Sequence, residues 1–326
     1  MSEMMLQQTQ VASCISYYNR FIREFPTVQK LAESPLEKVL ELWQGLGYYS
    51  RARNLHEAAR EVVERFQGVL PDSEETLKTL PGIGDYTAAA IRALAYNKPS
   101  AMVDANIRRV LGRMYALETT GHGQEQEIAN RCLALSRIGR PRIVNQALME
   151  LGATVCLPRN PACGDCPVVT FCEAFSRGEF VWYGSAPRQI KKTAKTETCV
   201  VATLDASFLL ARPADGRWRG LWEFPRVSLE GEPEAEEISQ LFTGIFGLAP
   251  EKVHFAGQIR HTVTRFDISL RIFRGKIDRL PDNPLREILT ANLKDLECIP
   301  MPSPMRKIAR GLLNEDGLFQ GDIAEL

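Results

Sequence analysis

The first half of the chain repeats apolar side chains at helical spacing. Over positions 11–25 they fall three or four residues apart, which predicts an amphipathic helix that stops at Pro26. Ser-Pro-Leu-Glu at 34–37 has the form of a capping box with proline at the first helical position, and predicts a helix that continues to Trp43. A stripe over 55–66 closes at Gly68. Further helices are expected at 87–95, 107–114 and 146–155.

The pattern changes in the second half, where short strand-like runs are separated by turn signals and one helix is expected near 234–246. The expected strands cover 199–204, 208–211, 253–259 and 266–273. A chain of 326 residues is long enough for two domains with their own cores. We predict a helical domain over 1–183, a basic linker over 184–196, an α+β domain over 197–305 and a C-terminal tail over 306–326.

Composition narrows the picture without assigning a function. The 40 basic and 40 acidic side chains cancel, so any nucleic-acid contact must depend on local basic patches and backbone amides. The sequence has no long apolar run that could cross a membrane and no signal peptide, and we expect a cytoplasmic, bacterial-type monomer with no membrane partner. Eight cysteines in such a chain fit a reducing compartment, where thiols bind metal or pack.

Four of the cysteines stand close together in the spacing C-x6-C-x2-C-x5-C. Thiolates are preferred ligands of iron–sulfur clusters and of structural zinc. Zinc sites commonly carry two short C-x2-C pairs and this loop has one, which favours a [4Fe–4S] cluster over zinc and over buried thiols without a metal. The candidate ligands are Cys156, Cys163, Cys166 and Cys172.

This spacing resembles the cluster loop of the superfamily that contains endonuclease III and the adenine DNA glycosylases. Ser-Glu-Met-Met-Leu-Gln-Gln-Thr-Gln-Val at 2–11 resembles the S-E-x-M-L-Q-Q-T-Q-V motif of the adenine glycosylases. Leu-Pro-Gly-Ile-Gly at 80–84 resembles the helix-hairpin-helix turn of the superfamily, and Val-Asp-Ala-Asn-Ile-Arg-Arg-Val at 103–110 resembles its catalytic aspartate segment. Gly-Leu-Trp-Glu-Phe-Pro at 220–225 resembles a Nudix-like domain.

The resemblance implies a multidomain fold. An all-α helix-hairpin-helix DNA glycosylase domain would carry the iron–sulfur cluster loop at 156–172, and an α+β Nudix-like C-terminal domain would follow it. A Nudix hydrolase needs a helix with an R-E-x-x-E-E metal-binding run, and residues 236–241, Glu-Glu-Ile-Ser-Gln-Leu, lack it. We therefore expect the second domain to recognise a ligand and not to hydrolyse one.

Asp104 precedes an apolar-periodic helix, so it is a natural N-cap. The resemblance implies a second role, in which its carboxylate lies beneath the deoxyribose C1′ of an extruded nucleotide and stabilises or traps an oxocarbenium-like transition state. Glu3 would then protonate the adenine at N7, so that the base can leave. The pair resembles the two carboxylates of a glycosidase.

Three more residues are implied as parts of this site. Asn106 and Tyr86 match positions that support the sugar and the carboxylates, and Glu150 matches a glutamate that contacts the flipped adenine. Endonuclease III-like enzymes that cleave the strand carry a lysine at the position of Tyr86. A phenol cannot form a Schiff base, so we expect a monofunctional enzyme.

Other residues are implied in DNA binding. The backbone amides of the Gly82–Gly84 turn would approach a phosphate. Gln8 would fill the gap left by the extruded base, with Thr9 in the same DNA-binding run, and Tyr48 would intercalate beside the opposing base. Candidate phosphate contacts are Arg51, Arg53 and Arg159.

The chain departs from the family pattern in two places. Relatives read the opposing 8-oxoguanine with a loop that ends Phe-Ser-His, and Val263, Thr264 and Arg265 stand in those places here. We expect Thr264 and Arg265 to contact the opposing base, with reduced discrimination for the lesion over guanine. Relatives also carry a helix and an L-P-W-R-like segment before the catalytic glutamate, whereas Glu3 is the third residue here. We expect either a misassigned start or a truncated, weaker enzyme.

The sequence therefore predicts a monofunctional glycosylase that removes adenine opposite 8-oxoguanine or guanine in duplex DNA. Three alternatives stay open. A glycosylase for another mispaired base, such as thymine opposite guanine, could use the same scaffold. A catalytically silent lesion-binding protein would bind mismatched duplex but release no base. A cluster-bearing redox or scaffold protein would need neither the hairpin nor Asp104.

Overall fold

The computed structural model describes residues 1–117, 122–179, 183, 192–227, 234–263, 265–282 and 284–313. Its chain forms two compact units. The first contains residues 1–7 and 57–189, and the second contains residues 8–56 and 190–326. Within the described residues, no helix combines the length and the apolar character that crossing a bilayer requires. The domain division that we predicted from sequence stays a prediction.

The first unit is built from helices. Its elements are α1 (Ser2–Leu6), the greater part of α5 (Ser50–Phe66), α6 (Glu74–Lys78), α7 (Asp85–Ala90), the π-helical η1 (Ile91–Ala95), α8 (Ala105–Met114), α9 (His122–Ile138), α10 (Pro141–Thr154), the short turns η2 (Cys163–Asp165) and η3 (Val169–Phe171), and α11 (Glu173–Arg177). Its core includes Met102, Ile107, Leu111, Cys132 and Leu148. The helices predicted near 87–95, 107–114 and 146–155 are confirmed.

α6 and α7 form a helix-hairpin-helix, which follows from the residues at its turns. Ser73 caps α6, because its hydroxyl accepts the Thr76 N–H at 3.4 Å. Gly82 has φ +74°, a left-handed conformation that glycine adopts without steric cost, and Gly84 is the N-cap of α7. A Cβ added at Gly84 would meet no atom within 4 Å, so the outer side of this turn is open.

The second unit begins with three helices, α2 (Val11–Glu24), α3 (Val28–Glu33) and α4 (Leu36–Trp43). The helix predicted over 11–25 and the one ending at Trp43 are confirmed. The predicted capping box is wrong. Ser34 ends α3, and its hydroxyl donates to the Lys30 carbonyl at 2.7 Å, while Pro35 is the N-cap of α4. The serine satisfies a carbonyl of the preceding helix because the two helices follow each other without a linker.

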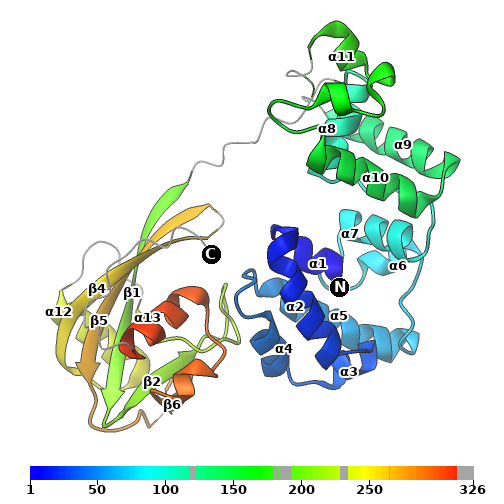
Figure 1. The fold of residues 1–326 in the computed structure, drawn as a ribbon. Helices are drawn as coiled ribbons and strands as arrows, with labels where there is room; N and C mark the ends of the chain where they lie inside the picture. The colour runs from blue at the N-terminus through cyan, green and yellow to red at the C-terminus, as the bar shows by residue number, and fades with distance from the viewer. Residues whose placement is uncertain are drawn as a thin grey trace. The chain divides into compact units, whose positions relative to one another are not determined.

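The rest of the second unit is a six-stranded mixed sheet with helices on its faces (Figure 1). The strands are β1 (Thr193–Leu204), β2 (Ser207–Arg212), β3 (Arg226–Val227), β4 (Glu251–Val263), β5 (Phe266–Lys276) and β6 (Glu287–Asn292), in the order β4-β5-β1-β2-β6 with β3 paired to β1. β1 and β5 are parallel, and the other pairs are antiparallel. The four predicted strands are confirmed. The predicted limit at 196 falls within β1.

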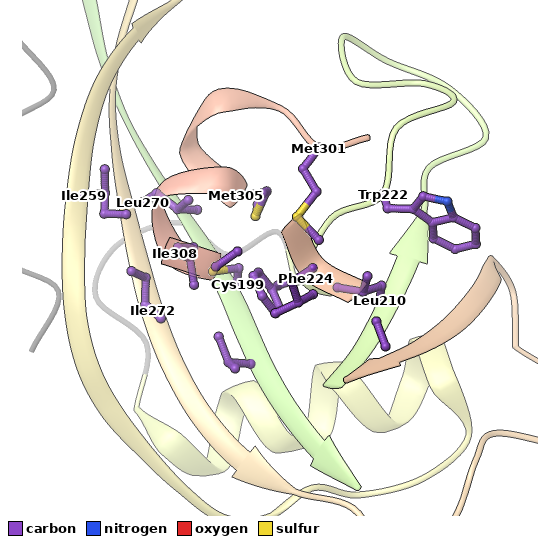
Figure 2. Packing of buried hydrophobic residues seen from close by; sticks show 14 of the residues in the cluster. Cys199, Leu210, Trp222, Phe224, Ile259, Leu270, Ile272, Met301, Met305 and Ile308 are labelled. Atoms are coloured by element: carbon purple, nitrogen blue, oxygen red, sulfur yellow. The ribbon is translucent and has the colours of Figure 1, made fainter. Parts of the chain in front are cut away.

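Side chains that alternate along β1 pack into two hydrophobic cores, one on each face of the sheet. Cys199 faces the helix α13 (Ser303–Leu313), whose Met305 and Ile308 are buried in the same cluster, as Figure 2 shows. Val200 faces α12 (Ala235–Phe246) on the other side, where Phe242 is buried. The helix predicted near 234–246 is therefore confirmed, and the limit predicted at 305 falls within α13. The remaining short turn is η4 (Asp295–Glu297).

Candidate active site and cluster loop

Asp104 is held by two neutral donors at the start of α8. Its Oδ1 accepts the backbone N–H of Ile107 at 2.7 Å, so the predicted N-cap is confirmed. Its Oδ2 accepts the side-chain amide of Asn106 at 2.9 Å. Asp104 is half-buried, and these two hydrogen bonds fix the orientation of its carboxylate.

Arg109 fixes Asn106 from behind. Its Nη2 donates to Asn106 Oδ1 at 2.8 Å and to the Gly152 carbonyl at 2.6 Å, and its Nε donates to the Cys156 carbonyl at 2.7 Å. The guanidinium is buried, and this burial lowers its pKa. One arginine therefore ties the Asp104–Asn106 pair to the end of α10 and to the first cysteine of the cluster loop.

Sequence reasoning assigned no role to Arg109 or Gly152, although Arg109 lies in the motif at 103–110 and Gly152 in the helix predicted at 146–155. No pattern marked Arg109, because the apolar positions 107, 110, 111 and 114 of this helix share one face and Arg109 falls on the opposite face, where a charged residue is ordinary. Gly152 lets α10 approach α8 closely. A Cβ there would lie 2.6 Å from Asn106 Cβ and 3.0 Å from its backbone oxygen, and no pattern within one helix reveals such a contact.

Glu3 and Tyr86 meet in the same unit. The Tyr86 hydroxyl donates to Glu3 Oε2 at 3.2 Å, and it lies 3.9 Å from the sulfur of Met149. Burial raises the pKa of Tyr86, and the negative charges of Glu3 and Asp104 raise it further. The phenol therefore stays protonated and neutral between two carboxylates, and acts as a donor.

Four of the predicted site residues therefore lie in one unit with linked electrostatics: Glu3, Tyr86, Asp104 and Asn106. Glu150 lies on α10, the helix that also carries Met149 and Gly152, and its side chain is exposed. A contact between Glu150 and a base stays a prediction. Gly82 and Gly84 lie at the exposed turn between α6 and α7.

The four predicted cysteine ligands gather around one small cavity. Cys156 follows α10, Cys163 begins the turn η2 and Cys166 ends it, and Cys172 is the N-cap of α11. All four line the cavity, together with apolar side chains that include Val155, Pro161, Val169 and Phe175.

These residues fit an iron–sulfur cluster. Arg113 Nη1 donates to the sulfur of Cys156 at 3.3 Å, and the same guanidinium binds the carbonyls of Leu157 and Pro158, so a cation lies beside the thiols. The apolar wall and the N–H donor to sulfur are the surroundings that such clusters have in proteins. Among the described residues, no three His, Cys, Asp or Glu side chains are arranged to hold a single metal ion.

The predicted DNA-probing residues Gln8, Thr9 and Tyr48 lie in the second unit. Gln8 is exposed and the Tyr48 side chain is 40% exposed. Arg51 is buried, with its guanidinium 5.4 Å from the Tyr48 ring centroid. A phosphate contact for Arg51 is therefore wrong, because neighbouring side chains and carbonyls already surround it.

Arg53 and Arg159 also carried predicted phosphate contacts. The Arg53 guanidinium donates to the Arg219 carbonyl at 2.8 Å, and Arg159 is exposed on the cluster loop. Of the residues predicted to read the opposing base, Thr264 lies outside the described residues. Arg265 is exposed, its guanidinium 5.1 Å from the Phe266 ring centroid at the β4–β5 turn.

The neighbouring residues hold the described ends of this turn. The Thr262 hydroxyl donates to Asp267 Oδ1 at 2.6 Å, and Lys192 lies 3.3 Å from the same carboxylate oxygen. These two exposed contacts link Thr262, Asp267 and Lys192 at this end of the sheet, and the Arg265 side chain is exposed to solvent.

Comparison with known proteins adds three family matches. The HhH-GPD superfamily base excision DNA repair proteins match residues 1–136. The iron–sulfur binding domain of endonuclease III matches residues 156–172, which supports the [4Fe–4S] assignment over zinc. The NUDIX domain matches residues 198–311.

Individual relatives agree with these matches. The chain is 35% identical to the adenine DNA glycosylase of Mus musculus, over 86% of this chain and 64% of that protein. It is 32% identical to the adenine DNA glycosylase of Buchnera aphidicola subsp. Baizongia pistaciae, over 94% of this chain and 87% of that protein. The chain spans about three fifths of the length of the mammalian relatives it matches.

A solved structure supports the fold of the helical part. The structure of a thermostable thymine-DNA glycosylase superposes with a TM-score of 0.50 at 28% sequence identity, covering 54% of this chain and 82% of that one. The helical part of this chain therefore has the fold of a DNA glycosylase. It carries the hairpin, Asp104 and the cluster loop.

Proposed function

This chain belongs to the adenine DNA glycosylase family, and we propose that it hydrolyses the N-glycosidic bond of adenine mispaired with 8-oxoguanine or guanine in duplex DNA. The observation that carries the proposal is the Asp104 carboxylate, which two neutral donors orient and which forms no ion pair or hydrogen bond with an arginine among the described residues. Such a carboxylate keeps its negative charge for a cation that develops in front of it.

The two carboxylates take different steps. Glu3 delivers a proton to N7 of the extruded adenine, so that the bond electrons can leave with the base. Asp104 stabilises the positive charge that then develops at C1′. Water adds its hydroxyl there, and its remaining proton returns to the Glu3 carboxylate to complete the hydrolysis. The products are free adenine and an abasic site. Tyr86 and Asn106 hold the two carboxylates in place through the contacts of 3.2 and 2.9 Å.

Tyr86 supports a monofunctional reaction. A lysine at this position could attack C1′ and form the Schiff base from which strand cleavage proceeds. The phenol lacks the required nitrogen, and its burial and its two acidic neighbours keep it protonated. The product therefore keeps an intact strand.

The cluster loop supports binding and geometry in this proposal. Cys156, Cys163, Cys166 and Cys172 would hold the [4Fe–4S] group, which when bound cross-links the loop to the end of α10. Arg113 offsets the negative charge of the thiolates. Arg109 ties the Cys156 backbone to Asn106, so an ordered loop also orders the active site.

Recognition of the opposing base falls to the second unit. Gln8 and Tyr48 present exposed side chains suited to fill a gap in a base stack, and we assign Thr264 and Arg265 to the opposing base. Arg265 is a permanent cation, which favours phosphate or guanine edges, so discrimination for 8-oxoguanine over guanine is reduced. Equal ratios of excision rates for the two bases in the protein and in Arg265→His would contradict this.

The experiment for the activity is single-turnover release of adenine from a duplex that carries adenine opposite 8-oxoguanine, with Asp104→Asn as the control. Release that disappears in the control supports the proposal. Tight mispair binding without release identifies a silent lesion-binding protein. Release of thymine opposite guanine, with adenine left in place, identifies a glycosylase for another base.

A further inference from the structure

The two residues that we assign to the gap in the base stack share an unusual backbone conformation. Gln8 has φ +56° and Tyr48 has φ +47°. Residues other than glycine seldom adopt this left-handed region, because the Cβ crowds the backbone, and they keep it only where the surroundings enforce it. The Gln8 side chain is exposed and that of Tyr48 is 40% exposed, so their own packing does not enforce the conformation.

The buried side chain of Arg51 contacts residues next to Gln8 and next to Tyr48. Arg51 Nη2 donates to Thr9 Oγ1 at 3.2 Å, directly after Gln8 in the chain. The same nitrogen donates to the carbonyls of Leu46 and Gly47 at 3.2 Å, directly before Tyr48. The two segments lie about forty residues apart in sequence and meet at this guanidinium.

Aromatic rings complete the arrangement. The Arg51 guanidinium lies 5.5 Å from the Trp43 ring centroid and 5.4 Å from that of Tyr48. The Trp43 indole N–H donates to the Gly47 carbonyl at 3.1 Å, so this carbonyl accepts from both side chains. Burial lowers the pKa of Arg51, which reflects the cost of placing a cation here.

We propose that Arg51 is a positioning residue that fixes the Gln8–Thr9 turn and the Gly47–Tyr48 turn against each other, so that Gln8 and Tyr48 enter the base stack as one rigid device. The inference rests on the proposed function, because it presumes that these two side chains probe the mispair. It assigns to Arg51 a task that a lysine cannot perform, since one ammonium cannot match the planar fork of a guanidinium and its stacking on the rings.

A packing role alone makes a different forecast. If Arg51 only stabilised the fold, its replacement would lower the melting temperature, and the correctly folded fraction would still open the mispair normally. If Arg51 positions the two probes, the folded protein binds duplex but opens the mispair poorly. Base opening and folding must therefore be measured separately.

The test uses the full chain and a duplex with 2-aminopurine opposite 8-oxoguanine, because this adenine analogue brightens when it leaves the stack. We expect Arg51→Lys to lower the opening equilibrium about tenfold, with affinity for a fully paired duplex within about twofold of the unchanged protein. Arg60→Lys is the matched control on the same helix, since Arg60 is exposed and pairs with Glu64 at the surface. Equal opening by Arg51→Lys and Arg60→Lys would overturn the proposal.

Thr9→Val gives a second variant that keeps the shape of the residue and removes the acceptor. Its expected effect is about threefold on opening, and Arg51→Lys should cost little more in its presence, because both changes break the same link. Additive losses in the double variant would show that Arg51 does not act through Thr9. This variant keeps the test decisive even where Arg51→Lys folds poorly.

The measurements distinguish an incorrect role for Arg51 from an incorrect glycosylase function. If the unchanged protein neither opens nor releases the base, the assignment of Gln8 and Tyr48 as probes falls with the glycosylase function. If it opens the base and the Arg51 and Thr9 variants open it equally well, the glycosylase stands and only the positioning role of Arg51 is removed.

Discussion

Carboxylates and arginines gather in two regions of the molecule, and they are arranged in opposite ways. At Asp104 both hydrogen bonds come from neutral groups, and the Arg109 guanidinium donates to Asn106 and to the Gly152 and Cys156 carbonyls instead of to the carboxylate. In the C-terminal sheet Arg226 donates directly to Glu223 at 2.7 Å and to Glu197 at 3.2 Å.

The difference shows what each region can do. Burial raises the pKa of Glu197, but Arg217 and Arg226 outweigh this and hold the pKa below its ordinary value. At Glu223 burial outweighs the same kind of contact and raises the pKa. A carboxylate paired with guanidinium groups has little charge left for a new cation, so Glu197 and Glu223 organise the fold. Asp104 is oriented without being neutralised, which is the arrangement that an electrostatic catalyst needs.

The largest expected effect is that of Asp104→Asn. Asparagine caps a helix as well as aspartate does, so α8 should keep its start, while the negative charge is lost. We expect single-turnover release of adenine to fall about a thousandfold or more, with mispair binding retained. Quenched time courses with enzyme in excess measure the rate, and thermal melting checks the fold.

The opposite result would remove the basis of the comparison. If Asp104→Asn released adenine within about tenfold of the unchanged rate, the charge at this position would not matter for catalysis. Asp104 would then be a helix cap alone.

Glu223→Gln tests the other region. Glu223 is fully buried, and its replacement by a neutral amide removes one of the two carboxylates that Arg226 contacts and the carboxylate that lies 3.8 Å from Arg286. We expect a loss of about 3 kcal/mol in the free energy of unfolding and no change in base release at 25 °C by the folded protein. Urea unfolding measures the loss, and Glu287→Gln on the exposed strand edge is the control.

A loss of catalysis without a loss of stability in Glu223→Gln would contradict the division between the two regions. It would place a buried charge of the sheet among the groups that act on the substrate. Equal stability of Glu223→Gln and Glu287→Gln would show that the buried pair contributes nothing.

Arg109→Lys should have an intermediate effect. A lysine cannot bind Asn106, Gly152 and Cys156 together, so Asn106 loses its fixed orientation and Asp104 loses a well-placed donor. We expect base release to slow about tenfold to thirtyfold. Arg108→Lys is the matched control, because Arg108 lies on the same helix and pairs with the exposed Glu125.

Iron content and mispair affinity separate two causes in Arg109→Lys. A slow enzyme with full iron and normal affinity places the defect at Asp104. Loss of iron in step with the rate would instead mean that Arg109 acts by holding the cluster loop.

The sequence predicted the elements better than the contacts between them. Periodicity found α2, α8, α12 and four strands, and the position of Asp104 before an apolar helix predicted its cap. The local capping pattern at Ser34 failed, because a preceding helix competed for the same hydroxyl. β6 and α13 were not predicted, although β6 is as long as the predicted β2 and the apolar side chains of α13, Met305, Ile308 and Ala309, recur at helical spacing.

Long-range contacts were outside the reach of any pattern. The role of Arg109 depends on α10 lying against α8, and that of Arg51 depends on Thr9 meeting Gly47. Arg51 continues the apolar spacing of Leu55, Ala58 and Val62, and a charge on an apolar face is a signal that a partner exists, whereas Arg109 carries no such signal. Only the fold shows which groups are the partners of each arginine.

The smallest expected effect is a change in stability with pH, which arises from His261 in the C-terminal sheet. His261 is buried against Trp218, and neither ring nitrogen has a hydrogen-bond partner within the described part of the chain. Burial lowers its pKa to about 4, with Arg217 and Arg226 acting in the same direction and Glu197 opposing them. Its unfolded pKa is about 6.5, so the stabilisation is present above that pH and is lost as the pH falls through about 4.

We therefore expect the melting temperature to fall by a few degrees between about pH 6.5 and pH 4, and to fall less in His261→Phe. Proton uptake here adds a cation beside two arginines that are already paired, so it weakens the sheet without reaching Asp104. Base release by the folded protein should therefore show the same pH profile in both proteins. A changed profile in His261→Phe would connect the two regions and contradict their independence.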